Sequence, residues 1–345
     1  MKKVCFFTVY GKNGASSNYR ILQFEKELNK EFETKYFSFW NDRYINKYIK
    51  DKKKYALCIA ISYVFCLCRR GYQLIAVAPK YDIVFFQKKI IPKSRINFLM
   101  YLKRRNTKII FDVDDAIYID EKPRGFSSYV ASKSDAVIVG NDELEKYYSF
   151  FSNTVIQIPT VEYTPAYLPY KKNTYEKKII GWIGTKSTIN NLDLIVKPIN
   201  DLVQKHTEIE FLIICDDDCG YLKKIKNSKF IKWKLDSYIK ELSEISIGIM
   251  PLKNTKSNQG KCGFKLIQYL NLEKPVIASN VGINLKIVRN YGDIVKNDNW
   301  YELLEKYLFN EEYYQEKVQK IKKDFNCFYG YEVALEKIKK AIAYI

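Results

Sequence analysis

Two lysines and a glutamine recur along one apolar segment of the second half of the chain. The run 260–279 reads GKCGFKLIQYLNLEKPVIAS, and its nearly unbroken apolar stretch predicts a buried helix over 262–272. Lys261, Lys265 and Gln268 are spaced four and three residues apart, so they share one face of that helix. Two ammonium groups on a buried face require an anion, and a helix N-terminus also attracts one.

The glycines of the same segment fit a phosphate ligand. Gly260 and Gly263 lack side chains and would let a diphosphate approach the backbone closely. The segment follows an expected strand over 245–250, which puts it at a carboxyl-terminal strand end. The alternative is a surface helix whose lysines face solvent.

A third lysine lies in a turn at the start of the C-terminal half. In IIGWIGTKST (179–188), a strand ends at Gly184, Lys186 occupies the turn, and Ser187 or Thr188 caps the following helix. A glycine turn that leads into a helix commonly cradles phosphate. Because such turns are common, an ordinary strand-to-helix connection remains the alternative.

Three carboxylates follow an apolar strand in KIIFDVDDAIY (108–118). Asp112, Asp114 and Asp115 would repel one another unless they serve a ligand or pair with cations. Three readings stay open: a Mg²⁺ site, binding of an acceptor hydroxyl, and ion pairing with the basic residues of 104–108.

The first expected turn, GKNGASSNYR (11–20), offers polar groups at the other end of the chain. Gly14 and the amides near Ser16 could meet phosphate or sugar hydroxyls, and Arg20 is one helical turn further on. The G-x-G-x-x-G spacing is missing, so a dinucleotide fingerprint is not supported.

Some chemistry is excluded by what the sequence lacks. His206 is the single histidine, which removes mechanisms that need a histidine base. Neither G-x-S-x-G nor G-x-x-x-x-G-K-[ST] occurs. The eight cysteines show no metal-ligand spacing and are typical of a reduced, cytoplasmic protein.

The charge is strongly positive. The 345 residues carry 58 Lys+Arg against 39 Asp+Glu, and the excess is larger in residues 1–160, with 28 basic and 16 acidic residues. This balance suits phosphorylated substrates, an anionic membrane or nucleic acid, although lysine-rich composition alone could also produce it.

One segment raises a membrane question. Residues 55–68 are apolar and flanked by lysines 52–54 and arginines 69–70. Fourteen residues are too few to span a bilayer, which takes about 20. We expect a buried helix, with a helix lying on an anionic inner leaflet as the alternative.

Short apolar runs alternate with helical stretches, which indicates two α/β sheets in tandem. The expected strands are 4–9, 33–38, 82–87, 108–113, 135–140, 154–158, 178–184, 210–215, 229–234, 245–250 and 275–279. The expected helices include 16–29, 94–105, 187–205 with a kink at Pro198, 237–243, 262–272, 299–308 and a last helix with Leu335, Ile338, Ile342 and Ile345 in one stripe. Proline-rich residues 161–177 read as a linker.

At this point the residues resemble a known family. The run from Gly248 to Gly282 is similar to the donor-binding segment of family 4 GT-B glycosyltransferases. GWIGTKST (181–188), FDVDDAIY (111–118) and SSNYR (16–20) resemble its bacterial branch, which serves surface-polysaccharide assembly.

The resemblance implies a GT-B fold of two Rossmann-like domains that face each other across a deep cleft. Residues 1–160 would form the acceptor-binding domain, 161–177 the linker, 178–328 the nucleotide-sugar-binding domain, and 329–345 a helix that returns to the first domain. The implied enzyme is a cytoplasmic, metal-independent hexosyltransferase at the inner face of the plasma membrane. It moves sugar with retention from a UDP or GDP sugar to a glycan or lipid-linked acceptor in polysaccharide, lipopolysaccharide or capsule synthesis, and has no cofactor and no nucleic-acid partner.

The resemblance also implies roles for single residues. Lys261 and Lys265 would hold the diphosphate, with Lys186 assisting. Gln268 and Gly260 stand where many members have a pair of glutamates that bind the ribose and the donor sugar, and Thr185 is closest to a usual arginine.

Further donor contacts would come from Gly184, Gly263 and Gly14. Asp114 would orient the acceptor hydroxyl, and Asp112, Asp115, Ser16 and Arg20 would bind the acceptor.

Two other classes of protein remain possible from the residues alone. One is a Mg²⁺-dependent phosphohydrolase that uses Asp112 as nucleophile and Asp114 as acid and base. The other is a basic module that binds anionic membrane or nucleic acid. The interleaved tyrosines and lysines of 41–55 support this alternative.

Overall fold

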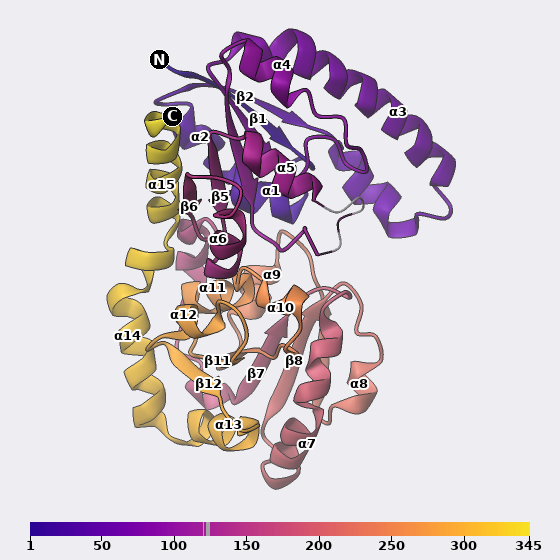
Figure 1. Cartoon of the computed structure of the whole chain (residues 1–345). Coiled ribbons are helices and arrows are strands. Elements are labelled where there is room, and N and C mark those ends of the chain that lie inside the picture. Colours follow the sequence, from indigo (N-terminus) through magenta and orange to yellow (C-terminus); the bar gives the residue numbers. More distant parts are fainter. Residues whose placement is uncertain (120, 122–124) are drawn as a thin grey trace. The chain divides into compact units, whose positions relative to one another are not determined.

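The computed structural model describes residues 1–119, 121 and 125–345. Contacts between residues divide the chain into two units. Unit 1 comprises Met1–Val161 and Ala334–Ile345, and unit 2 comprises Glu162–Val333. Each unit contains one six-stranded sheet flanked by helices (Figure 1). The two α/β sheets in tandem agree with the sequence, although only five strands were expected in the second one.

The sheet of unit 1 is parallel throughout, with strand order β2-β1-β3-β4-β5-β6. Its strands are β1 Lys3–Thr8, β2 Glu33–Ser38, β3 Ile83–Gln87, β4 Lys108–Val113, β5 Ala136–Val139 and β6 Val155–Gln157. All six coincide with expected strands. Continuous apolar runs are typical of parallel strands covered on both faces, and the edge strand β2 (ETKYFS) is the exception among these six.

The helices of unit 1 depart further from expectation. They are α1 Ala15–Arg20, α2 Glu25–Leu28, α3 Ala56–Tyr72, α4 Leu99–Arg104, α5 Phe126–Lys133 and α6 Asp142–Tyr148. The continuous helix expected over 16–29 is wrong, since a 3₁₀ turn at Leu22–Phe24 separates α1 from α2. The hydroxyl of Ser17, within α1, accepts a hydrogen bond from the amide of Tyr10 at 3.0 Å. The helix expected over 94–105 is shorter than predicted, since α4 covers only the second half of that range.

Helix α3 corrects the expectation of a buried helix. It is longer than the apolar run, and only Cys66 and Arg70 are buried within it. The side facing the sheet packs on the core of unit 1, while the opposite side remains exposed. No helix among the described residues is long and apolar enough to cross a bilayer.

Helix α15 (Tyr331–Tyr344) begins in unit 2 and completes unit 1. Leu335, Ile338 and Ile342 of the expected stripe are buried, which confirms that stripe up to Ile342. Lys2 Nζ donates to the carbonyl of Ile342 at 3.2 Å, so the helix is also tied to the first residues of the chain.

The sheet of unit 2 is likewise parallel, with order β12-β11-β10-β7-β8-β9. Its strands are β7 Ile179–Ile183, β8 Glu210–Cys215, β9 Ser228–Lys232, β10 Ile247–Met250, β11 Val276–Ser279 and β12 Gly292–Val295. The first five were expected within two residues at each end. β12 was not, because a four-residue strand followed by polar residues forms no apolar run.

Eight helices surround this sheet in the described part of unit 2. They are α7 Val196–Lys205, α8 Tyr221–Lys224, α9 Tyr238–Leu242, α10 Lys256–Gln259, α11 Phe264–Asn271, α12 Asn284–Val288, α13 Trp300–Phe309 and α14 Glu311–Tyr329. The expected kink at Pro198 is wrong. A 3₁₀ turn at Ile189–Leu194 precedes α7, so Pro198 falls in the first turn of the helix, where its missing amide hydrogen costs nothing.

Residues 162–177 group with unit 2 and contain two 3₁₀ turns, Thr164–Tyr170 and Tyr175–Lys177. Thr174 between them is buried, and its hydroxyl donates to the carbonyl of Ile245. The segment is therefore part of the packing of unit 2 as well as a connection.

Candidate active site

The strand order of unit 2 creates a natural place for a ligand. After β7 the chain adds β8 and β9 on one side, and then returns to place β10 on the other side. The connections that leave β7 and β10 therefore diverge, and in open α/β sheets ligands bind where neighbouring connections diverge in this way. Both segments singled out for phosphate binding, 184–188 and 260–268, follow these two strands.

The turn after β7 is fixed by carboxylates of the next connection. The amide of Lys186 donates to Asp216 Oδ1 at 2.6 Å, and its Nζ lies 2.9 Å from Asp217 Oδ2. These contacts raise the pKa of Lys186, chiefly through its hydrogen bond to Asp217. Thr185 Oγ1 is hydrogen-bonded to the hydroxyl of Ser187 at 2.9 Å. Lys186 is exposed, and its ammonium group is paired with Asp217.

The connection after β10 is held by Asn191. Its side-chain oxygen accepts from the amide of Lys253 at 2.9 Å and from Asn258 Nδ2 at 3.1 Å. Lys253 Nζ also lies 2.9 Å from Asp193 Oδ2. The route from β10 to α11 is thus tied to the segment that follows β7.

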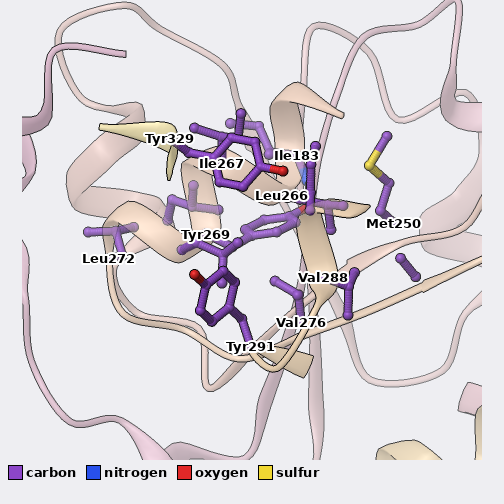
Figure 2. Close-up of a cluster of buried hydrophobic side chains, with 14 of the residues drawn as sticks. Ile183, Met250, Leu266, Ile267, Tyr269, Leu272, Val276, Val288, Tyr291 and Tyr329 are labelled. Carbon is purple, nitrogen blue, oxygen red and sulfur yellow. The ribbon is translucent and has the colours of Figure 1, made fainter. Parts of the chain in front are cut away.

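Tyr269 fixes helix α11 on the two strands (Figure 2). Its fully buried hydroxyl accepts from the amide of Ile183 at 3.0 Å, and it donates to the carbonyl of Ile249 at 3.1 Å. Ile183 ends β7 and Ile249 lies near the end of β10. Burial raises the pKa of Tyr269, so the hydroxyl stays protonated and keeps both bonds.

Lys265 lies one turn before Tyr269 and consequently reaches the end of β7. A methyl group placed on Gly184 would collide with the Trp182 ring at 2.4 Å and would approach Lys265 Cε to 3.0 Å. Lys265 Nζ lies 5.7 Å from the centre of the same ring. The lysine is half-buried. The structure therefore brings Gly184 and Lys265, which are 81 residues apart in sequence, into direct proximity.

Lys261 does not lie on the same helix, which corrects the expected helix over 262–272. Gly263, with φ of 69°, precedes the first residue of α11, so Lys261 belongs to the turn between α10 and α11. A side chain at Gly263 would collide with Ile287, which explains this glycine without a ligand. Lys261 is half-buried and Gly260 is buried.

Gln268 is buried and belongs to a polar cluster that the sequence did not reveal. Its Nε2 donates to Glu162 Oε1 at 2.7 Å, and Tyr238 Oη donates to Glu162 Oε2 at 2.7 Å. Glu162 lies 106 residues before Gln268, in the proline-rich segment. A buried carboxylate therefore lies directly beside Gln268.

In unit 1, Asp112 and Arg20 form a buried ion pair at the end of β4. Arg20 Nε lies 3.2 Å from Asp112 Oδ2, and Arg20 Nη2 contacts Asp112 Oδ1. The same guanidinium donates to the carbonyl of Ile158 at 2.8 Å and to Thr160 Oγ1 at 3.2 Å. Because both side chains are almost fully buried, they hold β4, α1 and the segment after β6 together.

Asp114 and Asp115 share the ammonium group of Lys88. Lys88 Nζ lies 3.0 Å from Asp114 Oδ1 and 2.7 Å from Asp115 Oδ2. Burial opposes the charge on Lys88, but the two carboxylates outweigh it and raise its pKa. Burial also raises the pKa of Asp114, against the opposing pull of Lys88. Arg20 and Lys88 are thus cation partners of these carboxylates, in place of the basic residues of 104–108 named in one of the three readings.

Gln87 connects the other predicted residues of unit 1. It is fully buried at the end of β3, its Nε2 donates to Ser16 Oγ at 3.0 Å, and its Oε1 accepts from Ser17 Oγ at 2.9 Å. A methyl group at Gly14 would approach Tyr10 Cβ to 2.3 Å, so packing requires this glycine.

Within the described ranges, no three His, Cys, Asp or Glu side chains are grouped to hold a metal ion.

Residues 177–308 match the family model described as glycosyl transferases group 1. HepE from Anabaena, solved with UDP and glucose, is 10% identical with a TM-score of 0.67 over 100% of both chains. Sucrose-phosphate synthase from Thermosynechococcus elongatus is 10% identical with a TM-score of 0.66 over 100% of this chain and 99% of that one. A glycosyltransferase from Rickettsia africae is 17% identical, with a TM-score of 0.64 over 99% of both. No curated protein matches the sequence.

The two kinds of similarity cover different parts of the chain. At 10–17% identity, the solved structures show a shared fold along the whole chain. The family match covers the part of unit 2 that contains β7, β10 and α11. The solved structures therefore show a shared two-domain fold, and the group 1 glycosyl transferase match covers residues 177–308, which is less than half of the chain.

Proposed function

We propose that unit 2 binds a nucleotide-diphosphate sugar where β7 and β10 end, and that the enzyme transfers this sugar to an acceptor with retention of configuration. The proximity of Lys265 to the end of β7 carries the proposal, because it puts a half-buried ammonium group at the start of α11 and close to the turn that follows β7. UDP bound to HepE makes a uridine nucleotide the first candidate, with a guanosine nucleotide as the second.

The proposed chemistry rests on charge stabilisation. When the bond from the anomeric carbon to the β-phosphate oxygen breaks, negative charge develops on the departing diphosphate. Ammonium groups already fixed in place stabilise that charge without proton transfer. We assign this role to Lys261 and Lys265, with Lys186 assisting from the turn after β7, and we propose that the step needs no metal ion.

Gln268 would bind the ribose of the nucleotide. Since its Nε2 already donates to Glu162, its amide oxygen is the atom that would accept a ribose hydroxyl. Thr185 would offer its hydroxyl to the diphosphate, and Gly260 would let the donor approach the backbone, whereas Ile287 fills the space beside Gly263.

Unit 1 would bind the acceptor, a glycan or a lipid-linked glycan of polysaccharide, lipopolysaccharide or capsule synthesis. Asp114 would orient the attacking hydroxyl, while Asp115 and Ser16 would contact the acceptor and the Arg20–Asp112 pair would support them. An Asp114→Asn variant that keeps the wild-type kcat with a natural acceptor would contradict this role. A lipid-linked acceptor would place the enzyme at the inner face of the plasma membrane.

Nucleotide binding tests the donor site. Thermal unfolding and calorimetry should be measured with UDP, GDP and their glucose and mannose derivatives. A ligand at a hundredfold excess over its Kd stabilises by about 2.7 kcal/mol, so one nucleotide should raise the Tm by several degrees. Lys265→Ala should weaken that nucleotide by about 10- to 100-fold, since it removes one charged hydrogen-bond donor.

Lys240→Ala is the matched control. Lys240 is exposed on α9, so this variant removes one positive charge from the same unit and should bind the nucleotide with wild-type affinity. Equal affinity of the Lys265→Ala variant and the wild type would refute the assignment, as would the absence of stabilisation by every nucleotide.

The phosphohydrolase alternative is disfavoured by the position of Asp112. A nucleophilic carboxylate must reach the substrate phosphorus, whereas the Asp112 side chain is only 1% exposed and is engaged by the guanidinium of Arg20.

A further inference from the structure

An exposed apolar strip runs along the outer side of α3 in unit 1. Its members recur every three or four residues and therefore lie on one side of the helix. Leu57, Ile61, Val64, Phe65 and Tyr72 are each between 59% and 73% exposed. Cys58 and Cys68 are exposed on the same strip. These seven residues are called the outer strip of α3 below.

The outer strip does not belong to a loosely attached helix. The opposite side of α3 packs on the core of unit 1 through Cys66 and the half-buried Tyr63 and Leu67. The buried guanidinium of Arg70 donates to the carbonyls of Thr8, Phe37 and Ile90 at 3.0 to 3.1 Å. Helix α3 is therefore fixed to the ends of three strands, and its outer strip is presented to solvent by a rigid support.

The surroundings of the outer strip are basic. Residues 52–111 contain 14 lysines and arginines, of which Arg70 is buried and Lys88 is paired with two aspartates, and a single acidic residue, Asp82. Exposed Lys52, Lys53 and Lys54 directly precede the helix. The ring of Tyr55 lies 5.6 Å from Lys54 Nζ, which joins an aromatic side chain to the basic end of the strip.

The geometry fits a surface better than a bilayer-spanning element. A helix of 17 residues is about 25 Å long, and one whole side of α3 is occupied by the protein. Apolar side chains with basic residues at the rim are typical of helices that lie in the interface of an anionic membrane. A second copy of this chain is a poorer occupant, because two identical basic rims would meet and repel each other.

We infer that the outer strip of α3 docks unit 1 onto an anionic lipid bilayer, with Leu57, Ile61, Val64 and Phe65 entering the interface and Lys52–Lys54 contacting the headgroups. This inference extends the proposed transfer to a lipid-linked acceptor and rests on it for the choice of the cytoplasmic leaflet. Binding to vesicles can nevertheless be measured without donor or acceptor.

Flotation of the full chain with vesicles tests the inference. The wild type should float with mixed phosphatidylcholine and phosphatidylglycerol and much less with phosphatidylcholine alone. The double variant Ile61→Ser/Phe65→Ser should lower the partition coefficient at least about tenfold, because it removes exposed apolar surface without touching the core. Lys52→Ala/Lys53→Ala/Lys54→Ala should do the same on anionic vesicles only.

Matched variants elsewhere control for composition and charge. Phe150→Ser/Leu285→Ser removes two exposed apolar side chains outside α3. The triple variant Lys223→Ala/Lys224→Ala/Lys226→Ala removes three exposed charges from unit 2. Both should float like the wild type, as should Lys265→Ala, which separates this inference from the proposed donor site.

The native cysteines give an independent measurement. Anionic vesicles should slow alkylation of Cys58 and Cys68 by iodoacetamide at least several-fold, while exposed Cys219 and Cys327 in unit 2 should react at unchanged rates. Equal flotation of the wild type and the Ile61→Ser/Phe65→Ser variant would overturn the inference. Failure of the wild type to float would do so too, and so would a dimer in solution that alone protects these cysteines.

Discussion

Lys265 and Tyr269 are one turn apart on α11, and this spacing links the proposed phosphate contact to the sheet. Tyr269 bonds to the backbone of both β7 and β10. Any displacement of its ring would therefore move Lys265 away from Gly184. The sequence singled out Lys265 as a candidate phosphate contact, but the contacts of Tyr269 depend on strand neighbours that only the folded chain defines.

The carboxylates after β4 show the same limit. Their type and position could be predicted from the sequence, because polar residues at a strand end stand out against an apolar run. Their partners could not, since Arg20 precedes Asp112 by 92 residues and Lys88 comes from a different strand. Glu162 escaped notice for the same reason, as its partner Gln268 is 106 residues away.

Lys274 makes stability depend on pH. It is completely buried in unit 2, and its Nζ donates to the carbonyl of Lys172 at 2.7 Å and to Thr174 Oγ1 at 2.6 Å. Burial lowers its pKa to about 7, against about 10.4 in an unfolded chain. The unfolded chain binds the extra proton between these values, so this residue should increase the free energy of unfolding from about pH 7 to about pH 10 and add no pH dependence below pH 7.

Urea unfolding at several pH values measures this contribution. Lys274→Met should remove the part of the rise above pH 7 that the wild type shows, whereas Lys240→Met, at an exposed position, should retain it. Identical pH profiles for the wild type and the Lys274→Met variant would show that the ammonium group is not destabilised by burial.

At the scale of elements, continuous apolar runs were the most informative signal. Eleven of the twelve strands in the described structure coincide with expected strands. The inner strands are mostly apolar because they are covered on both sides, whereas the edge strands β2 (ETKYFS) and β9 (SKFIK) are not continuous apolar runs. Helices were predicted less well. The apolar run of α3 indicated burial, but composition alone cannot separate a side that packs on the sheet from one left exposed.

Helix α14 illustrates the opposite error. Its sequence is largely polar, so it was not among the expected helices. Its buried residues nevertheless recur at Tyr314, Val318, Ile321, Phe325 and Tyr329, which is the spacing of a single narrow helical stripe. A search restricted to strongly apolar segments overlooks such a helix.

Gly248 tests how closely α11 must approach β10. A methyl group at this position would lie 2.2 Å from Tyr269 Cγ, and the buried ring has no room to retreat. Gly248→Ala should therefore lower the free energy of unfolding by about 1–3 kcal/mol. It should also weaken nucleotide binding, because α11 carries Lys265; urea unfolding and calorimetry measure the two effects.

Gly71→Ala is the control for that substitution. Gly71 lies in α3, and a methyl group there would meet nothing within 4 Å. Alanine is favoured over glycine in a helix by about 0.5–1 kcal/mol, so this variant should be as stable as the wild type or slightly more stable. Unchanged stability of the Gly248→Ala variant would mean that α11 can shift away from β10 at no cost.

At the scale of the whole molecule, unit 1 is built from two separate stretches of sequence, Met1–Val161 and Ala334–Ile345. The apolar stripe of the last helix indicated that it packs on a core, and the resemblance to GT-B enzymes indicated which one. The stripe alone could not do so, because an amphipathic helix carries no information about its partner.

Ile342 tests the contribution of this second stretch. It is fully buried in unit 1, so Ile342→Ala should cost about 2–5 kcal/mol. Hydrogen exchange should speed up in β1 and β2 and stay unchanged in β7 and β8. Tyr344→Ala, at an exposed position of the same helix, should change stability by no more than about 0.5 kcal/mol. Equal acceleration of exchange in both units would contradict this assignment.

The divided sequence of unit 1 also sets the order in which the protein matures on the ribosome. Residues 334–345 are translated after all of unit 2, although they complete the unit that is translated first. Translation runs at about 5–20 residues per second, so on the order of ten to thirty seconds pass before α15 can pack on the nascent β-sheet of unit 1. Unit 2 can thus finish folding first. During this interval a chaperone can bind the surface of unit 1 that α15 later covers.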